Sequence, residues 1–520
     1  MLVIAILWGC TGAGEDTGSV TATGPDDACD VVDPYPSLIL DNDWQAERFG
    51  TLDFQARDGN MLRAFTFRSS GFEPATGPIL FVMHGSGRTA ESYLEAMIPV
   101  AERVGAVAIA PEFPETLYPD SDDYTLGVGT GVVPDGGVYD PDEWRAPSDY
   151  VFSELEHLFE GIKDQLGSQV CRYHAFGHSA GSQFLQRLVL FLPHARVERV
   201  AAANAGWYTL PDWGDFDDEN THVPYGLQGS PVNATDLQAG LGQGLIVMVG
   251  ELDTATSEED SEVRGSDEAE AQGAHRLARG EFHVAAGRAQ ADALGVTLGW
   301  SLQVVPQAGH SKDHVASTAG WALFRGPDES WSDGCEPSEA ADAGALVLNE
   351  LHADPAPDLS GDANGDGRLD GSEDEFLELY NGGSDPLCLA GWTISDVARS
   401  GVATLLPGTE LPAGGTLVLF GGGAALGDFG DAQVDWGGRL SLSGEGDVVT
   451  LRDAAGATVL QASWGDCEGV ACAASHYAEN LLDVGTSLTR SPELTGEWVL
   501  HSSVAEALYS PGTRADGTGL

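Results

Sequence analysis

Six short apolar runs between residues 37 and 326 alternate with amphipathic stretches, and this alternation is the strongest constraint on the fold. The runs are rich in β-branched and small apolar residues, as buried strands of parallel sheets are. The amphipathic stretch 149–167 has apolar residues at helical spacing, which is typical of a helix that covers a sheet. The sequence therefore predicts an α/β domain at 37–331 with a doubly wound, mostly parallel sheet, whose strands are Ile79–His84, Ala106–Glu112, Tyr173–Gly177, Val197–Ala205, Leu245–Gly250 and Ser301–Pro306.

The pattern changes after residue 331. Residues 332–344 are polar and predict a linker, and beyond them short alternating runs are separated by glycine-rich turns with no convincing helix between them. We expect an all-β sandwich at 345–516. A chain of 520 residues is long enough for two such domains.

Acidic residues dominate the charge of the chain. The 81 acidic and 24 basic residues give a formal net charge of −57, which repels nucleic acid and anionic lipid. A nucleic-acid partner is therefore not expected.

The chain begins with an apolar run of ten residues that ends at Cys10. This run is too short to span a bilayer but resembles the end of a bacterial lipoprotein signal, in which the cysteine is lipidated. We interpret 1–36 as a signal and polar tether. This interpretation predicts an exported protein, either anchored to the outer membrane through Cys10 or extracellular.

The remaining cysteines fit export, because an even set of six permits three disulfides in an oxidising compartment. Cys467 and Cys472 are close enough in sequence to form a local disulfide. The sequence leaves open how the other four pair: Cys29, Cys171, Cys335 and Cys388.

Ser179 lies in the segment Gly177-His178-Ser179-Ala180-Gly181, between a predicted strand and an amphipathic stretch. A nucleophile elbow needs this strand, tight turn and helix, with glycines two residues before and after the serine because the backbone bends sharply there. The alternative is a glycine-rich turn without chemistry. The context favours a nucleophilic serine.

A serine nucleophile needs a base and an acid that orients the base. His310 and Asp253 each follow a predicted strand, so they should lie with Ser179 at the carboxyl edge of the sheet. Glu251 is the alternative acid. We expect a structural role for His178, and a metal pair of His310 with His314 is disfavoured because no third ligand is near in sequence.

The loop after the first predicted strand reads His84-Gly85-Ser86-Gly87. It would place the N–H of Ser86 beside the active site, where together with the N–H of Ala180 it would form an oxyanion hole. A plain glycine turn is the alternative.

Five segments of residues 37–326 carry a resemblance to a known family: HGSGRTAESY, APEF, GHSAGSQF, GELDT and PQAGH. They resemble α/β-hydrolases, in particular secreted bacterial esterases related to polyhydroxybutyrate depolymerases and feruloyl esterases. The resemblance implies hydrolysis of carboxylic esters through an acyl-serine, without a cofactor for catalysis. Trp207 and Tyr208 follow a predicted strand and are candidates for the wall of an acyl pocket or for core aromatics.

Residues 362–373 follow the ligand plan of an EF-hand calcium loop. Oxygen-bearing residues occupy positions 1, 3, 5, 9 and 12, a backbone carbonyl is available at position 7, and a glycine, Gly367, stands at position 6. The flanking sequence indicates a loop and a strand, so an isolated structural Ca²⁺ loop is expected, with a disordered Asp/Gly turn as the alternative. Its ligands would be Asp362, Asn364, Asp366, the carbonyl of Arg368, Asp370 and Glu373.

The segments VLNELHADP, EFLELYNGGSDPLCLAGWTISD and HSSVAEALYSPGTRADG resemble a bacterial lamin-tail domain over about 345–516. The resemblance implies an immunoglobulin-like sandwich with an accessory or surface role. It implies no particular ligand or cell-surface partner.

The sequence as a whole predicts an exported serine esterase that acts on a small or polymeric ester through Ser179, His310 and Asp253. Two other functions stay open. One is a serine peptidase of the same fold, because amide and ester cleavage use the same groups. The other is a calcium-dependent surface binding protein without activity.

Overall fold

The structure is a computed structural model. It describes residues 40–41, 44–45, 48–119, 121–128, 144–214, 222–306, 308–325, 337–397, 402–404, 410–436, 440, 442–467 and 469–520. The predicted signal and tether, with Cys10 and Cys29, lie outside these residues, as does Cys335 in the predicted linker. In the described ranges, no helix combines the length and apolar character that crossing a membrane requires.

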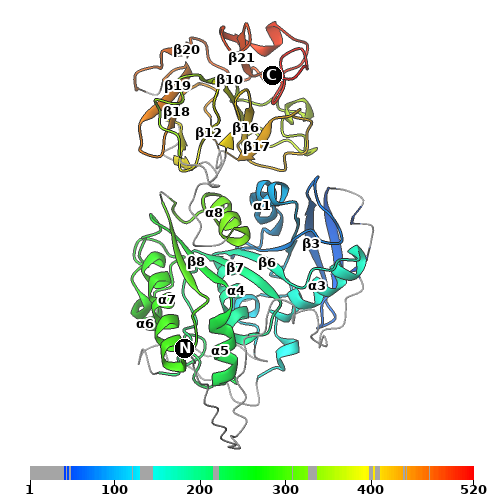
Figure 1. Cartoon of the computed structure of the whole chain (residues 1–520), viewed down its shortest axis with the longest axis vertical. Helices are drawn as coiled ribbons and strands as arrows, with labels where there is room; N and C mark the ends of the chain where they lie inside the picture. Colours follow the sequence, from blue (N-terminus) through cyan, green and yellow to red (C-terminus); the bar gives the residue numbers. More distant parts are fainter. Residues whose placement is uncertain are drawn as a thin grey trace, which may run out of the picture.

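In the described part of the chain, a nine-stranded sheet forms the first unit, in the order β1-β2-β3-β5-β4-β6-β7-β8-β9 (Figure 1). From β5 to β9 all neighbours are parallel, and β1, β2 and β3 extend the sheet with antiparallel pairs. The mostly parallel sheet is therefore confirmed. Its strands are β1 Leu40–Asp41, β2 Phe49–Gln55, β3 Met61–Arg68, β4 Ile79–Met83, β5 Val107–Pro111, β6 Tyr173–His178, β7 Val197–Ala203, β8 Leu245–Gly250 and β9 Ser301–Val305.

Helices cover both faces of this sheet. Successive residues of β4 belong alternately to two hydrophobic clusters, because side chains of a strand point to opposite faces. One cluster includes residues of α3, α4, α5 and α7, and the other includes residues of α1 and α8. The helices are α1 Ala90–Val104, α2 Ser121–Thr125, α3 Ser153–Leu166, α4 Ala180–Phe191, α5 Ala234–Gly242, α6 Asp267–Gln272, α7 Arg276–Leu294 and α8 Lys312–Phe324, with a 3-10 turn η3 at Pro147–Asp149.

The second unit is built from two larger sheets and a two-stranded pair, as far as its residues are described. The six-stranded sheet has the order β17-β16-β11-β10-β21-β22, the five-stranded sheet β14-β13-β18-β19-β20, and β12 pairs with β15. Residues of both larger sheets share one core around Trp392 and Trp464, so the predicted sandwich is confirmed. The strands are β10 Leu346–His352, β11 Phe376–Asn381, β12 Leu387–Cys388, β13 Thr393–Ser395, β14 Val402–Thr404, β15 Glu410–Leu411, β16 Thr416–Phe420, β17 Gln433–Trp436, β18 Gly446–Arg452, β19 Thr458–Gly465, β20 Ser475–Tyr477, β21 Leu488–Ser491 and β22 Glu497–Leu500, with 3-10 turns η4 at Leu359–Gly361 and η5 at His501–Ser503.

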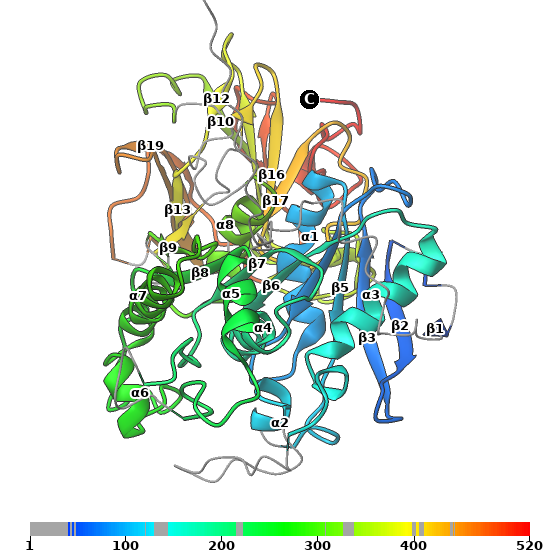
Figure 2. The same ribbon diagram turned by 60° about the horizontal axis from the view of Figure 1, so that its bottom comes forward.

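The β-sandwich lies against the face of the first unit that carries α1 and α8 (Figure 2). Arg103 of α1 pairs with Asp435 of β17 at 3.0 Å. Arg368, from the predicted calcium loop, pairs with Glu91 and, at 3.6 Å, with Glu95 of α1. Ion pairs from two parts of the sandwich thus hold it to one helix.

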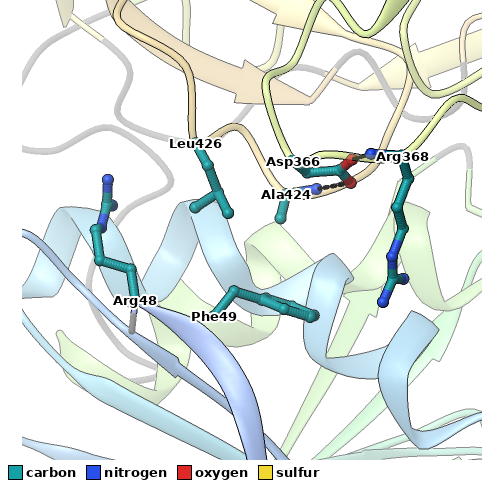
Figure 3. Close-up of a pocket in the computed structure, with 6 residues that line it drawn as sticks. All are labelled: Arg48, Phe49, Asp366, Arg368, Ala424 and Leu426. Atoms are coloured by element: carbon teal, nitrogen blue, oxygen red, sulfur yellow. Dashed lines mark hydrogen bonds between the residues drawn. The ribbon is translucent and has the colours of Figure 1, made fainter. Parts of the chain in front are cut away.

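A cavity of about 260 Å³ lies at this junction. Figure 3 shows Arg48 and Arg368 on opposite sides of Phe49. Arg48 is bonded to Glu102 at 2.7 Å and Arg368 to Glu91, so both guanidinium groups are already paired. The cavity is lined by Arg48, Phe49, Asp366, Arg368, Ala424 and Leu426.

Candidate active site

Ser179 lies at the turn between β6 and α4, with φ 55° and ψ −117°. A non-glycine residue with positive φ is strained, and such strain gathers at functional sites. The turn is tight on both sides. A Cβ atom built on Gly177 would lie 2.5 Å from the carbonyl oxygen of Gly181, and one built on Gly181 would lie 2.2 Å from the carbonyl oxygen of Met83. Neither glycine has room for a side chain, which agrees with the prediction that the sharp bend of a nucleophile elbow requires glycine at both positions.

The structure brings Ser179, His310 and Asp253 together from three separate loops. Nε2 of His310 lies 3.3 Å from Oγ of Ser179, and Nδ1 of His310 lies 2.8 Å from Oδ2 of Asp253. Because a carboxylate only accepts, Nδ1 carries the proton and Nε2 is left to accept from the serine hydroxyl. Asp253 is buried, whereas the side chain of His310 keeps 22% of its surface exposed.

The alternatives to these residues lie elsewhere. Glu251 is exposed, and the acid that contacts His310 is Asp253. Among the described residues, His310 and His314 belong to no cluster of metal-ligating side chains.

The loop between β4 and α1 passes directly beside the serine. A Cβ atom built on Gly85 would lie 3.7 Å from Cβ of Ser179. Ser86 follows Gly85, and Ala180 begins α4, where the first N–H groups of a helix have no partner within the helix. Ser86 and Ala180 thus belong to the two segments of chain that meet at Ser179, and the oxyanion hole of their two amides stays a prediction.

His84 fixes this loop from within the core. Its Nδ1 donates to the carbonyl oxygen of Gly85 at 2.9 Å, and its Nε2 accepts from the N–H of Phe113 at 3.0 Å. Burial lowers the pKa of His84 to about 4, so the ring is neutral at pH 7, as these bonds require.

His178 supports the base rather than replacing it. Its ring centroid lies 4.7 Å from that of His310, its Nδ1 is 3.2 Å from the hydroxyl of Tyr93, and its Nε2 is 3.4 Å from Nδ2 of Asn204. Burial, and to a lesser extent the charge of His310, holds the pKa of His178 well below its usual value. A neutral, buried ring that packs against His310 agrees with the predicted structural role.

Arg276 is a residue that sequence reasoning missed. Its Nη1 lies 3.2 Å from Oδ1 of Asp253, on the carboxylate oxygen that His310 does not use. Only proximity in the fold could reveal this contact, because 23 residues separate the two in sequence and no motif joins them.

The two predicted pocket residues have different surroundings. Tyr208 is fully buried and stacks on His283, with ring centroids 4.4 Å apart. These contacts fit the core position that the sequence offered as one of two alternatives for Tyr208, and a role in a pocket stays a prediction. Trp207 is also buried, between the guanidinium groups of Arg187 and Arg264 at 4.2 and 4.7 Å from its ring, and its role in a pocket stays a prediction.

The predicted calcium loop is closed by its own backbone. The carboxylate of Asp362 accepts from the N–H groups of Gly365, Asp366 and Gly367 at 2.8 to 3.1 Å. Gly367 has φ 84°, as the sharp bend at position 6 requires. The preceding η4 and the following β11 agree with the predicted absence of flanking helices.

Two carboxylate oxygens of the loop lie beside Gly423, and so does Nδ2 of Asn364. A Cβ atom built there would lie 3.2 Å from Oδ2 of Asp366 and 3.3 Å from Oε2 of Glu373. Burial, and then the charge of Asp362, raises the pKa of Asp366. The donor set of carboxylates, an amide and a carbonyl suits a hard cation such as Ca²⁺, which would offset this repulsion.

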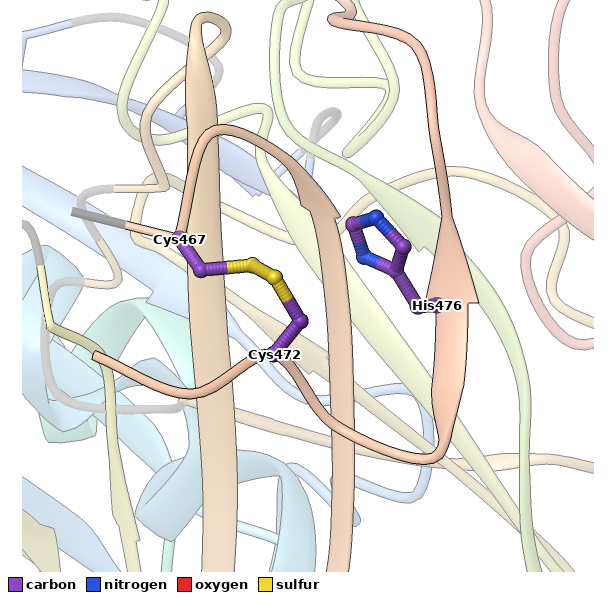
Figure 4. A group of neighbouring side chains, drawn as sticks. All are labelled: Cys467, Cys472 and His476. Carbon is purple, nitrogen blue, oxygen red and sulfur yellow. A yellow bond between two sulfur atoms is a disulfide. The ribbon is translucent and has the colours of Figure 1, made fainter. Parts of the chain in front are cut away.

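Cys467 and Cys472 form the predicted local disulfide (Figure 4). His476 lies near the two sulfur atoms, but disulfide sulfurs are not the thiolates that bind metals. Nδ1 of His476 is instead 2.9 Å from the hydroxyl of Ser463. Cys171 and Cys388 are each disulfide-bonded too.

Residues 339–466 match the family model of the Lamin Tail Domain. The sandwich extends beyond this match, because β21 and β22 complete the six-stranded sheet. A comparison with curated protein sequences finds no match.

Two solved structures resemble about half of the chain. Poly(aspartic acid) hydrolase-1 from Sphingomonas sp. KT-1 is 33% identical, and the match covers 53% of this chain and 98% of that protein, with a TM-score of 0.48. LpqC, a poly(3-hydroxybutyrate) depolymerase from Bordetella parapertussis, is 28% identical, and the match covers 56% of this chain and 93% of that protein, with a TM-score of 0.48. The strand order and the turn at Ser179 agree with the 33% identity over nearly the whole of poly(aspartic acid) hydrolase-1. The chain therefore belongs to the α/β-hydrolases, and it carries a C-terminal lamin tail domain.

Proposed function

We propose that the chain is an exported serine hydrolase that cleaves carboxylic esters through an acyl-serine intermediate. The observation that carries the proposal is the continuous chain of contacts from Oγ of Ser179 through both ring nitrogens of His310 to Asp253. A serine hydroxyl is activated when an imidazole accepts its proton through one nitrogen and a buried carboxylate holds the other nitrogen.

The proposed reaction has two halves. Oγ of Ser179 attacks the ester carbonyl carbon while Nε2 of His310 takes the hydroxyl proton, and the amides of Ser86 and Ala180 donate to the oxyanion. The imidazolium then protonates the leaving alkoxide, so that the alcohol departs and the acyl-enzyme remains. Water, deprotonated by His310, then attacks the acyl carbon. The bond to Oγ breaks, the carboxylic acid departs, and the imidazolium returns its proton to Oγ of Ser179. Asp253 stabilises the imidazolium in both halves.

A fluorophosphonate probe tests this proposal, because it reacts with activated serines. We expect wild-type protein to be labelled, heat-treated protein to be unlabelled, and the adduct to map by mass spectrometry to Ser179. An adduct on another residue, or no labelling of folded protein, would contradict the proposal and favour a calcium-dependent binding protein without activity.

Hydrolysis of a polyamide is the second candidate. It is favoured by the 33% identity with a protein named for its action on poly(aspartic acid). A panel of p-nitrophenyl esters of increasing chain length, poly(3-hydroxybutyrate) film and poly(aspartic acid) separates the candidates. Release of p-nitrophenol or hydroxy acid without cleavage of the polyamide supports the esterase, and the reverse result supports the second candidate.

Ca²⁺ bound by residues 362–373 is proposed to stabilise the lamin tail domain and to take no part in catalysis. Asp362, Asp366 and Glu373 would supply carboxylate ligands, and the ion would offset the repulsion between their charges. Support comes from the ligand spacing and from the position of Asp366 and Glu373, which both lie beside Gly423.

Chelation by EGTA should therefore lower the melting temperature of the protein. At a free Ca²⁺ concentration 100 times Kd, binding adds about 2.7 kcal/mol to the free energy of unfolding, which differential scanning calorimetry detects as a shift of several degrees. Glu373→Gln should abolish the shift, whereas Glu506→Gln, at an exposed position in the same domain, should retain it. Equal melting curves of wild-type protein with Ca²⁺ and with EGTA would remove the calcium assignment.

Export is proposed from the apolar run that ends at Cys10, and the disulfide Cys467–Cys472 supports it, since disulfides persist in oxidising compartments. Incorporation of a fatty-acid analogue that is lost in Cys10→Ser would identify the lipid anchor. A protein that reaches the medium without lipid would be extracellular, and one found only in the cytoplasm would contradict the proposal.

A further inference from the structure

Arg276 joins Asp253 to a second acid, Asp260. Its Nη1 lies 3.2 Å from Oδ1 of Asp253 and 3.3 Å from Oδ2 of Asp260. The side chains of Arg276 and Asp253 are each 2% exposed, whereas that of Asp260 is 34% exposed. A chain of polar contacts therefore continues from Ser179 through His310, Asp253 and Arg276 to an acid at the surface.

The first turn of α7 holds Asp253 at two points. Arg276 is the first residue of this helix, and its side chain contacts the carboxylate. The N–H of Leu277, the next residue, donates to the backbone carbonyl of Asp253 at 3.3 Å. Main chain and side chain of one helical turn thus fix both the position of Asp253 and the direction of its carboxylate.

A buried guanidinium at this place changes the electrostatics of the base. The carboxylate of Asp253 is shared between His310 on Oδ2 and Arg276 on Oδ1, so that less of its charge is available to stabilise an imidazolium. The other charged or titratable groups with electrostatic influence here are Asp260, which acts on His310, and His178 and Lys312. His178 is neutral and the charge of Lys312 is paired with that of Asp313, so Arg276, Asp253 and Asp260 dominate.

We infer that Arg276 is a positioning residue that makes His310 a proton acceptor at lower pH, by sharing the charge of Asp253, and that Asp260 moderates this effect. The inference rests on the proposed hydrolase function. It concerns a residue that never touches substrate, so its signature is the pH dependence of the reaction.

The test is the pH profile of fluorophosphonate labelling and of ester hydrolysis, measured with melting temperatures on the full chain. In Arg276→Gln the full charge of Asp253 stabilises the imidazolium. The acid limb of kcat/KM and of the labelling rate should therefore move up by about one pH unit. The plateau should fall at least tenfold, because the carboxylate loses a fixing contact.

Asp260→Asn should move the acid limb the opposite way, by a few tenths of a pH unit. The substitution removes a negative charge near His310, and Asp253 becomes the acid with which Arg276 pairs. Both changes destabilise the imidazolium of His310, but solvent around the partly exposed Asp260 screens most of this destabilisation. Because Asp260 is partly exposed, this variant keeps the test available if Arg276→Gln fails to fold. Arg276→Lys, which keeps the charge, should restore most of the wild-type profile.

Arg279→Gln is the matched control. Arg279 lies one turn further along α7, is equally buried, and binds the carbonyl oxygens of Gly206, Gly273 and Arg264 rather than Asp253. It should lower the melting temperature and leave the acid limb in place. If the acid limbs of Arg276→Gln and Asp260→Asn coincide with that of labelled, active wild type, Arg276 is only structural and the inference fails. If wild type is neither labelled nor active, the proposed function fails instead.

Discussion

Replacing Ser179 with alanine should lower kcat for ester hydrolysis by about six orders of magnitude and abolish fluorophosphonate labelling. The change removes the nucleophile, and neither His310 nor the oxyanion amides can form the acyl-enzyme without it. The fold should survive, because the side chain of Ser179 makes no capping hydrogen bond to α4 and alanine keeps the Cβ atom that already fits there. The measurement is steady-state hydrolysis of a p-nitrophenyl ester, beside a thermal melt.

Ser182→Ala is the control for this variant. Ser182 lies on the first turn of the same helix, is fully buried, and its hydroxyl has no hydrogen-bond partner among the described residues. Loss of an unpaired buried hydroxyl should leave both activity and melting temperature near those of wild type or slightly raise the latter. More than 1% residual activity in Ser179→Ala, with contaminating esterases excluded, would show that another group performs the attack.

Asp253→Asn should lower kcat by about four orders of magnitude with a smaller change in KM. Asparagine cannot stabilise the imidazolium, and its amide nitrogen turned toward His310 would favour the tautomer with the proton on Nε2, which cannot accept from Ser179. The variant also leaves the buried charge of Arg276 with Asp260, at 3.3 Å, as its remaining acidic contact among the described residues. A loss of stability of a few kcal/mol should accompany the loss of rate.

Glu251→Gln distinguishes the two acids that the sequence offered. Glu251 lies two residues before Asp253 and is exposed, so its replacement should change kcat less than twofold. Kinetics at pH 8 on both variants, with melting curves, decide the assignment. A large loss in Glu251→Gln together with an active Asp253→Asn would overturn it.

The sequence by itself determined the features whose signals are local. Apolar runs of five to nine residues predicted the six parallel strands because a strand buried on both faces is apolar along most of its length. Ser179, Asp253 and His310 could be chosen because each follows a strand, and parallel strands bring their carboxyl ends to one edge. Gly177 and Gly181 could be explained because an elbow leaves no room for Cβ atoms. The disulfide Cys467–Cys472 was predictable because its loop is short.

Only the tertiary structure decided which distant groups meet. Nothing near Arg276 in sequence indicates Asp253, and Arg368 reaches Glu91 across 277 residues. Tyr208 was a reasonable pocket residue by its position after a strand, but stacking on His283 buries it, because the direction of a side chain in a loop depends on the neighbours that the fold supplies. The periodicity of apolar residues indicates whether a segment forms a helix or a strand. Contacts between distant side chains depend instead on how the helices and strands pack against one another, which only the whole fold determines.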